Sequence, residues 1–258
     1  MDLVILGAGG KLGRLLRPLF PQRARWLTRA DVDIHDTAAM HVALRGADAV
    51  ICMAGVTNTS AQPLHMNTDV AVRTLDAARD ASSGRVFLLS SAAVYGAATG
   101  ACAEDGPTAP DSKYGESKLA MERVALQHPH PSTVLRLGNV AGADAILAGW
   151  VPGFQLDQLP DGSTPRRSYI GPNALARTLA ALARTSALPH LLNVAAPGCV
   201  QMGALLDAAR LEWKPQPATT ATIPTVNLDT TRLRMFTEFK ASDSTPIGIV
   251  EDWQNRKS

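Results

Sequence analysis

The first half of the chain alternates short apolar segments with longer stretches in which apolar residues recur every three or four positions. The apolar segments lie at residues 3–6, 24–28, 48–55, 85–91 and 132–140, and the stretches with helical spacing lie at 11–20, 37–46, 67–81 and 114–126. Short, almost wholly apolar strands separated by longer helices are typical of parallel strands covered on both faces. Right-handed crossovers between such strands predict an α/β fold with a doubly wound parallel sheet.

The pattern changes after about residue 143. Proline and glycine become frequent between residues 150 and 172, one helical stretch follows at 174–186, and a short strand is predicted at 191–196. The remainder, including the Pro/Thr-rich segment 214–225, predicts irregular structure. We therefore expect a Rossmann-type domain at 1–145 and a small substrate lobe at 146–258. This lobe interleaves with the last sheet elements, because residues 174–196 return to the sheet.

Composition narrows the class of protein. Of 258 residues, 46% are apolar and 19% are charged, which suits a packed core, and the net charge of +2 does not favour nucleic-acid binding. No apolar run approaches the roughly 18 residues of a membrane span, and the N-terminus reads as a strand rather than a signal peptide. Three cysteines without Cys-x-x-Cys spacing indicate neither a disulfide framework nor a metal site. We expect a cytoplasmic protein that binds no nucleic acid, membrane or metal.

A glycine-rich turn separates the first predicted strand from the first predicted helix. Gly7, Gly10 and Gly13 follow the strand at intervals of three, with Lys11 and Leu12 between the last two. Glycines at such a turn let backbone N–H groups approach a pyrophosphate, and a helix N-terminus adds a favourable partial charge. The turn is therefore a candidate dinucleotide site.

Further motifs follow in order: "DIHD" at 33–36, "ICMAG" at 51–55, "LLSSAAVYG" at 88–96, "YGESK" at 114–118 and "LRLGNVAG" at 135–142. With the glycine turn, this series resembles the extended short-chain dehydrogenase/reductase superfamily, in its epimerase/dehydratase branch. The resemblance covers roughly residues 3–142. It implies that Asp33 and Ile34 contact the adenine of a nicotinamide dinucleotide, and that Ala54 and Gly55 lie against the cofactor.

Tyr114 and Lys118 are four residues apart and share one helix face. A free tyrosine has a pKa of about 10, and we expect the nearby ammonium to lower the pKa of Tyr114, so that it exchanges a proton with a hydroxyl or carbonyl group. The resemblance implies that Lys118 also binds the nicotinamide ribose and that Ser91, rather than Ser90, holds the substrate oxygen. The alternatives are a surface pair without a role and a Ser91 hydroxyl that bonds only backbone.

The end of the second predicted strand bears on the choice between NAD and NADP. Proteins that prefer NAD often carry an acidic residue there, which binds the ribose 2′-hydroxyl. This chain has Thr28 followed by Arg29, and an arginine suits a 2′-phosphate. NADP is therefore favoured, with Arg14 as a possible second cation, while Asp31 and Asp33 keep NAD possible.

The C-terminal lobe carries weaker signals. Segment 164–177 resembles in part a family segment whose arginine pairs with a substrate diphosphate, and Arg167 stands at that position. Residues 171–173 replace the valine and acids of that segment, so a purely structural Arg167 is an alternative. Ser91, Asn139 and Arg167 are the candidate substrate-binding residues.

We therefore expect an NAD(P)-dependent oxidoreductase, with NADP favoured, that transfers a hydride between the cofactor and a carbonyl or secondary alcohol. The substrate is a small or sugar-like molecule. A nucleotide-sugar epimerase with tightly held NAD is one alternative, and a non-catalytic dinucleotide-binding sensor or scaffold is another. Ala92 and Ala93 disfavour a dehydratase, which needs an additional acid beside the serine.

The helices at 67–81 and 114–126 are those that pair across a dimer in the family. The resemblance therefore implies a homodimer. Apolar residues that suit either its interface or an ordinary core are Val70, Leu75, Leu119 and Met121. Asn67, at the start of the first of these helices, is either a helix cap or a site residue.

Overall fold

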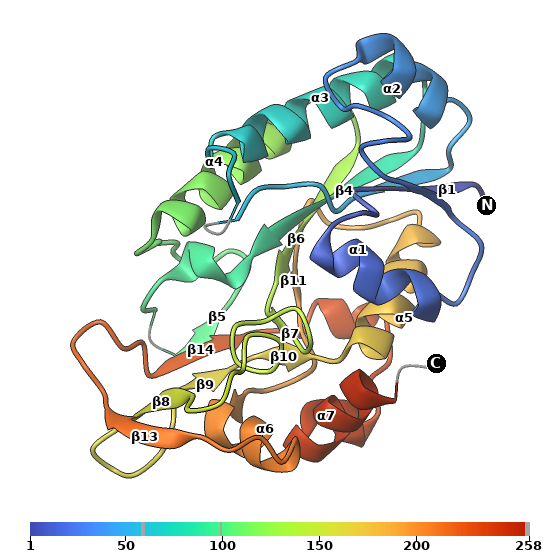
Figure 1. The fold of residues 1–258 in the computed structure, drawn as a ribbon. Coiled ribbons are helices and arrows are strands. Elements are labelled where there is room, and N and C mark those ends of the chain that lie inside the picture. The colour runs from blue at the N-terminus through green and yellow to red at the C-terminus, as the bar shows by residue number, and fades with distance from the viewer. Residues whose placement is uncertain (58–59, 99, 256–258) are drawn as a thin grey trace.

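The computed structural model describes residues 1–57, 60–98 and 100–255. A six-stranded sheet with the order β11-β6-β4-β3-β1-β2 forms its centre (Figure 1). Its strands are β1 (Leu3–Leu6), β2 (Arg25–Leu27), β3 (Ala49–Cys52), β4 (Arg85–Ser91), β6 (Ser132–Leu137) and β11 (Leu191–Val194). All neighbouring strands are parallel, which confirms the predicted doubly wound α/β fold.

Helices cover both faces of this sheet (Figure 1). One face carries α1 (Lys11–Leu16) and α5 (Pro172–Ala183), and the other carries α2 (Thr37–Leu44), α3 (Met66–Asp80) and α4 (Lys113–Gln127). Successive residues of a strand point to opposite faces, so Leu3 and Ile5 enter the first core cluster while Val4 and Leu6 enter the second. A wholly apolar strand is required because both faces are buried.

The first helix is shorter than predicted. It ends at Leu16 instead of continuing to residue 20, and a 3-10 turn, η1 (Arg17–Leu19), follows. Pro18 has no N–H group and cannot donate the next helical hydrogen bond to Arg14, so the α-helix stops.

Short strands from the C-terminal part, together with β5 and β7 from the first 140 residues, build three smaller sheets with orders β10-β7, β12-β9-β14-β5 and β13-β8. Their strands are β5 (Ala101–Cys102), β7 (Asn139–Val140), β8 (Gln155–Gln158), β9 (Arg166–Arg167), β10 (Tyr169–Ile170), β12 (Val200–Gln201), β13 (Lys214–Pro217) and β14 (Thr225–Leu228). The remaining helical elements are η2 (Ala92–Tyr95), α6 (Met202–Ala208), η3 (Leu233–Met235), η4 (Ala241–Ser244) and α7 (Pro246–Gln254). The division of the chain at residue 145 stays a prediction.

The prediction of irregular structure after residue 196 is wrong over β12, α6 and α7. Within it, the prediction for 214–225 is wrong at both ends, because β13 and the first residue of β14 lie there. In β13, Lys214 donates its N–H to Phe154 of the segment that enters β8, and Ala218 donates to Gln158. Because a strand has a period of two residues, Pro215 and Pro217 fall at positions whose N–H would face away from β8. The two prolines therefore remove no hydrogen bond from the pair.

The apolar residues considered for a dimer interface lie in the chain's own core. Leu75 and Met121 belong to the cluster between the sheet and helices α3 and α4, and Leu119 is buried in a neighbouring cluster. Val70 is partly buried and packs against the same sheet face. Of the two alternatives, ordinary core therefore applies to the buried residues, and the homodimer stays a prediction. Among the described residues, no helix combines the length and the hydropathy of a membrane span.

Candidate active site

A cavity of about 480 Å³ opens at the carboxyl ends of β1, β2 and β3. In doubly wound sheets, ligands bind in the crevice at this edge. The residues predicted to bind a cofactor that line the cavity are Gly7, Gly10, Arg29, Asp33, Ile34, Ala54 and Gly55. These residues are spread over nearly fifty positions of sequence, and the topology brings them around one cavity.

The glycine turn brings the end of β1 against the end of β3. Gly7 has a φ of 81°, and a Cβ there would lie 2.4 Å from the backbone nitrogen of Ala54. Gly10 precedes α1 and donates its N–H to the carbonyl of Gly7 over 3.0 Å. A Cβ on Gly13 would lie 2.6 Å from the carbonyl oxygen of Ala8, so the first turn of the helix packs directly on the loop. Glycine is required at 7 by both the left-handed backbone and the close approach to Ala54, and at 13 by close approach alone.

The other residues predicted from the glycine turn do not line the cavity. The side chain of Lys11 is exposed to solvent, Leu12 packs against the core cluster beneath α1, and Gly13 is buried within the turn. Their contribution to cofactor binding, through backbone N–H groups, stays a prediction.

Lys118 lies between α4 and the ends of β3 and β4. Its side chain is 6% exposed, and its Nζ donates to the carbonyl of Leu89 at 2.9 Å. A Cβ on Gly55 would lie 3.3 Å from this Nζ, so the ammonium reaches the wall of the cavity. Burial lowers the pKa of Lys118 to about 8, while Coulombic attraction from Cys52 and Glu122 opposes that effect.

Tyr114 lies on the same face of α4, and the Nζ of Lys118 is 5.9 Å from the centroid of its ring. Burial raises the pKa of the Tyr114 phenol, and a hydrogen bond with Ser91 partly opposes the shift. The expectation of a lowered pKa is therefore wrong for this arrangement. The ammonium donates to Leu89 and faces the aromatic ring, so it does not offset the loss of water around the phenol.

Ser91 and Ser90 face opposite sides of β4, as neighbouring strand residues do. The hydroxyl of Ser91 accepts a hydrogen bond from the N–H of Ala93 at 3.2 Å and also bonds Tyr114. The hydroxyl of Ser90 donates to Glu122. The structure thus brings Ser91, and not Ser90, together with Tyr114, while Ser91 also makes the backbone bond considered as its alternative role.

Asn139 lies in β7, at the start of the C-terminal part. Its side chain bonds the phenol of Tyr169, which also donates to Asp144 at 2.8 Å. Burial raises the pKa of Tyr169 well above its usual value, so this phenol stays neutral. Asn139 is thereby held at the edge of the sheet near the end of β6. Its side-chain amide already bonds Tyr169, and its predicted contact with substrate stays a prediction.

Arg167 lies in β9 and is half-buried. Burial lowers the pKa of its guanidinium, opposed by attraction from Tyr169, Asp111 and Cys199. It donates to the carbonyl of Arg166 at 2.7 Å, and no ion pair with a carboxylate is found for it within residues 1–57, 60–98 and 100–255. A partly desolvated cation without a carboxylate partner suits an anionic ligand.

Asn67 is neither a helix cap nor exposed. It is 1% exposed, and its amide accepts from the N–H of Val56 at 2.9 Å and donates to the carbonyl of Val56 at 3.1 Å. It also donates to Ser117 on α4, while His65 precedes α3 as its N-cap. Asn67 therefore ties the segment after β3, which lines the cavity, to α4.

Asp252 supplies an acid that the sequence lacks at 171–173. Its carboxylate accepts from the N–H groups of Asn173 and Ala174, at 2.7 and 3.1 Å, at the start of α5. Sequence reasoning missed this residue because it lies on α7, far along the chain. A single acid in a C-terminal helix carries no local signal of such a cap.

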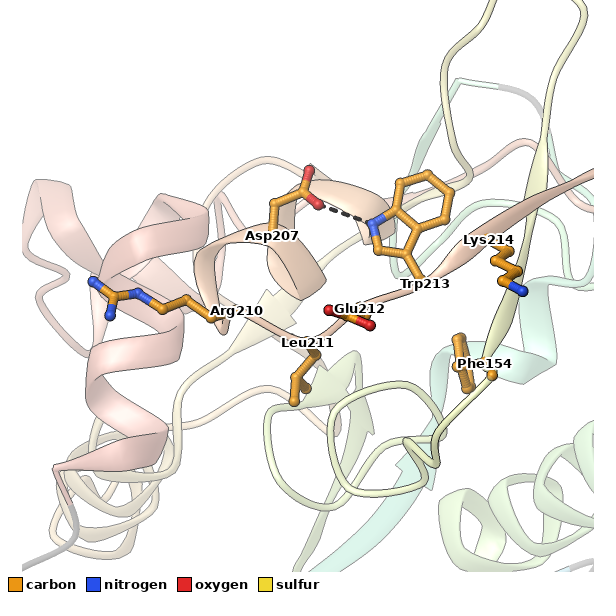
Figure 2. Close-up of a pocket in the computed structure, with 8 residues that line it drawn as sticks. Phe154, Asp207, Arg210, Leu211, Glu212, Trp213 and Lys214 are labelled. Carbon is orange, nitrogen blue, oxygen red and sulfur yellow. Dashed lines mark hydrogen bonds between the residues drawn. The ribbon is translucent and has the colours of Figure 1, made fainter.

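A second cavity, of about 530 Å³, lies in the C-terminal part beside α6 (Figure 2). Its walls include Phe154 and Trp213, and the indole of Trp213 donates to Asp207 at 2.8 Å. It shares no lining residue with the cavity at the glycine turn, and no predicted site residue lines it.

Residues 4–193 match the sequence profile of the NAD dependent epimerase/dehydratase family. A UDP-glucose 4-epimerase of Azospirillum brasilense is 39% identical over 108 residues, a stretch that covers 38% of this chain and 31% of that protein. A UDP-glucose-4-epimerase from Stenotrophomonas maltophila, solved with NAD and formylated UDP-arabinopyranose, has a TM-score of 0.79 at 18% identity, over 100% of this chain and 98% of that one. A short-chain dehydrogenase/reductase superfamily protein from Agrobacterium tumefaciens with bound NAD has a TM-score of 0.78 at 17% identity, over 100% and 97%.

Proposed function

This chain belongs to the NAD-dependent epimerase/dehydratase family, and we propose that it is a nicotinamide-dependent oxidoreductase. It transfers a hydride between the cofactor and a carbonyl or secondary alcohol of a small or sugar-like substrate. The observation that carries the proposal is the meeting of Tyr114, Lys118 and Ser91 beside the wall of the cavity at the glycine turn.

The cavity fits a dinucleotide. Gly7, Gly10 and Gly55 line it and carry no side chain, so a dinucleotide can approach the backbone of the turn and of the segment after β3. Asp33 and Ile34 line the end of the cavity near β2 and would hold the adenosine. The nicotinamide ring, when bound, supplies the hydride acceptor or donor.

Tyr114, Ser91 and Lys118 each have a different role in the proposed proton transfer. The raised pKa keeps the Tyr114 phenol protonated at neutral pH, so that it donates a proton to a carbonyl oxygen as that group is reduced. In the opposite direction the phenolate accepts the proton of an alcohol. Ser91 orients the substrate oxygen beside the phenol, and the Lys118 ammonium binds ribose hydroxyls and holds positive charge near the site.

We favour NADP over NAD because of the side chains at the end of β2. Arg29 lines the cavity there and has no ion-pair partner in the described part of the chain. The carboxylate of Asp31 is turned back onto Thr28, where it accepts from both the N–H and the hydroxyl at 2.8 and 2.7 Å. An exposed guanidinium suits a 2′-phosphate.

The cofactor proposal is tested by titrating emptied protein with NADPH and NADH. Arg29→Ala is expected to weaken NADPH binding about tenfold, because one charge-assisted contact is lost, and to leave NADH binding unchanged. Arg23→Ala, which removes an exposed arginine outside the cavity, is the matched control. Tighter binding of NADH than of NADPH would reject the preference.

A nucleotide-sugar epimerase with tightly held NAD is the second candidate. Arg167 carries a half-buried charge that forms no ion pair with a carboxylate in the described part of the chain, and this suits a substrate diphosphate. The local identity to a UDP-glucose 4-epimerase supports the same reading. Denaturing freshly purified protein separates the two candidates, since co-purified NAD indicates the epimerase and an empty protein indicates exchange of cofactor.

The catalytic roles are tested with Tyr114→Phe. We expect turnover to be lost and dinucleotide affinity to be retained, because the variant removes only the hydroxyl. Full activity in this variant would refute the mechanism. Failure of wild-type protein to bind either dinucleotide would refute both catalytic candidates.

We also propose a homodimer, from the family resemblance, and a cytoplasmic location, from the composition of the sequence. Static light scattering of the purified protein tests the first, and fractionation of cells tests the second. A monomer at micromolar concentration would contradict the dimer.

A further inference from the structure

A buried pair of charges lies behind the three proposed catalytic side chains. Glu122 is 1% exposed and Arg136 is 4% exposed. The Nη2 of Arg136 lies 2.7 Å from Oε2 of Glu122, and its Nε donates to both carboxylate oxygens at 3.1 Å. Burying two charges is unfavourable unless the geometry is good and the remaining polar atoms are bonded. The presence of a buried pair of charges behind the proposed catalytic residues therefore needs an explanation.

The carboxylate of Glu122 joins three elements. It belongs to α4, it accepts from Arg136 of β6, and it accepts from the hydroxyl of Ser90 at the end of β4. Ser90 directly precedes Ser91, and Lys118 lies one helical turn before Glu122. The carboxylate thus connects the strand end that carries Ser91 to the helix that carries Tyr114 and Lys118.

The groups around Lys118 identify Glu122 as the counter-charge of its ammonium, because the other titratable groups that face it are neutral. From β3 comes the thiol of Cys52, whose pKa is raised by burial, and from α4 comes the phenol of Tyr114, whose pKa is also raised. Both are neutral at neutral pH. From β4 comes the carbonyl of Leu89, and the segment after β3 presents Gly55. Arg136 of β6 pairs with the same carboxylate through its Nε and Nη2.

We propose that Glu122 is a positioning residue that keeps Lys118 protonated at neutral pH and holds α4 against the end of β4. This inference deepens the proposed function and rests on it for the role of Lys118. Burial already lowers the pKa of Lys118 to about 8, and Coulombic attraction from Glu122 opposes this shift; the contribution of Cys52 requires its thiolate, which burial disfavours at neutral pH. Removing the carboxylate removes attraction, so the ammonium loses its proton closer to neutral pH.

Nuclear magnetic resonance of protein labelled with ¹³Cε-lysine measures this directly. The chain has six lysines, and the Lys118 signal is the one absent from Lys118→Met. In wild-type protein we expect it to titrate well below the other lysines. In Glu122→Gln we expect its midpoint to move about one pH unit lower. Glu116→Gln, which neutralises an exposed acid on the same helix, is the matched control and is expected to leave the midpoint unchanged.

Glu122→Gln leaves the guanidinium of Arg136 buried without a counter-charge, so the variant risks failing to fold. The double variant Glu122→Gln/Arg136→Met removes both charges and avoids that problem. A lower Lys118 midpoint in either variant supports the proposal. An unchanged midpoint, with only a loss of thermal stability, would show that the pair is merely structural and overturn it.

The same variants separate this inference from the proposed function. NADPH affinity at pH 8 is expected to fall in the double variant by roughly the factor by which the protonated fraction of Lys118 falls. If wild-type protein binds no dinucleotide, the proposed function fails while the lysine titration still decides the role of Glu122. If NADPH binds and the Lys118 midpoint does not move, only the present inference fails.

Discussion

Replacing Gly7 with alanine adds one methyl group at the point where the glycine turn meets the end of β3. Residue 7 has a φ of 81°, in the left-handed region that side chains disfavour. The new Cβ would lie 2.4 Å from the nitrogen and 2.8 Å from the Cα of Ala54. These are backbone atoms of a segment that lines the cavity, so they cannot rotate away as a flexible side chain would.

The cost of Gly7→Ala has two parts. The left-handed conformation costs about 1–2 kcal/mol for a residue with a Cβ. Forcing a methyl group into a filled space costs about 1–3 kcal/mol more. The sum is about 2–5 kcal/mol, which for a chain of this size lowers Tm by roughly 4–20 °C.

Gly46→Ala is the matched control. Gly46 has a φ of 75°, but a Cβ there would meet no atom within 4 Å. This variant carries the backbone strain alone, so we expect a loss of about 1–2 kcal/mol. Urea unfolding followed by circular dichroism measures both variants, and NADPH titration follows the cavity. Only Gly7→Ala is expected to weaken binding, because only Gly7 lines the cavity.

Equal losses of stability in the two variants would refute this reasoning. They would mean that the close approach of Gly7 to Ala54 contributes nothing beyond backbone strain. Unchanged dinucleotide affinity in folded Gly7→Ala would contradict the placement of the cofactor against this turn.

Three further predictions follow from buried polar groups. Lys118 has a lowered pKa, so the folded chain releases this proton near pH 8, whereas the unfolded chain keeps it to about pH 10.4, and the stability of the fold rises with pH across that window. Lys118→Met is expected to abolish this rise, measured as the urea midpoint of unfolding between pH 7 and 10. A rise that persists in the variant would contradict the prediction. Asp252→Ala should lower the free energy of unfolding, measured in urea, by about 1 kcal/mol because it removes the cap of α5. Glu251→Ala removes an exposed acid and is the control that should leave stability unchanged. Equal losses of stability in the two variants would reject the capping role of Asp252. Asn67→Ala should cost about 1–3 kcal/mol and weaken NADPH binding by freeing the segment at Val56, and unchanged binding would argue against this tie.

Local pattern was sufficient to predict the sheet and its order of elements. The strands at 3–6 and 85–91 are recognisable because strands buried on both faces are mostly apolar. The single strand predicted at 132–140 is wrong in its last part, because the segment divides at Gly138 into β6 and β7, which belong to different sheets. The left-handed turn at Gly7 follows from glycine spacing after a strand, and the shared face of Tyr114 and Lys118 follows from the helical period. Each of these depends only on residues close together in sequence.

Tertiary structure decided the properties that depend on distant partners. Whether Leu75 and Met121 face the core or another subunit depends on what packs against α3 and α4. The strand at Pro215 and Pro217 exists because β8, about sixty residues earlier, accepts the N–H groups between and beyond them. The spacing of neighbouring residues could predict neither the partner of this helix face nor the strand.

The charge states of the site residues also depend on partners that are distant in sequence. The spacing of Tyr114 and Lys118 established that they are neighbours, but the direction of the Tyr114 pKa depends on how much water the phenol loses and where the ammonium points. The counter-charge at Glu122 is held by Arg136 from another strand. Sequence by itself therefore determined which groups could react. Only the folded chain decided their charge states, because desolvation and Coulombic attraction depend on distances between segments that are far apart in sequence.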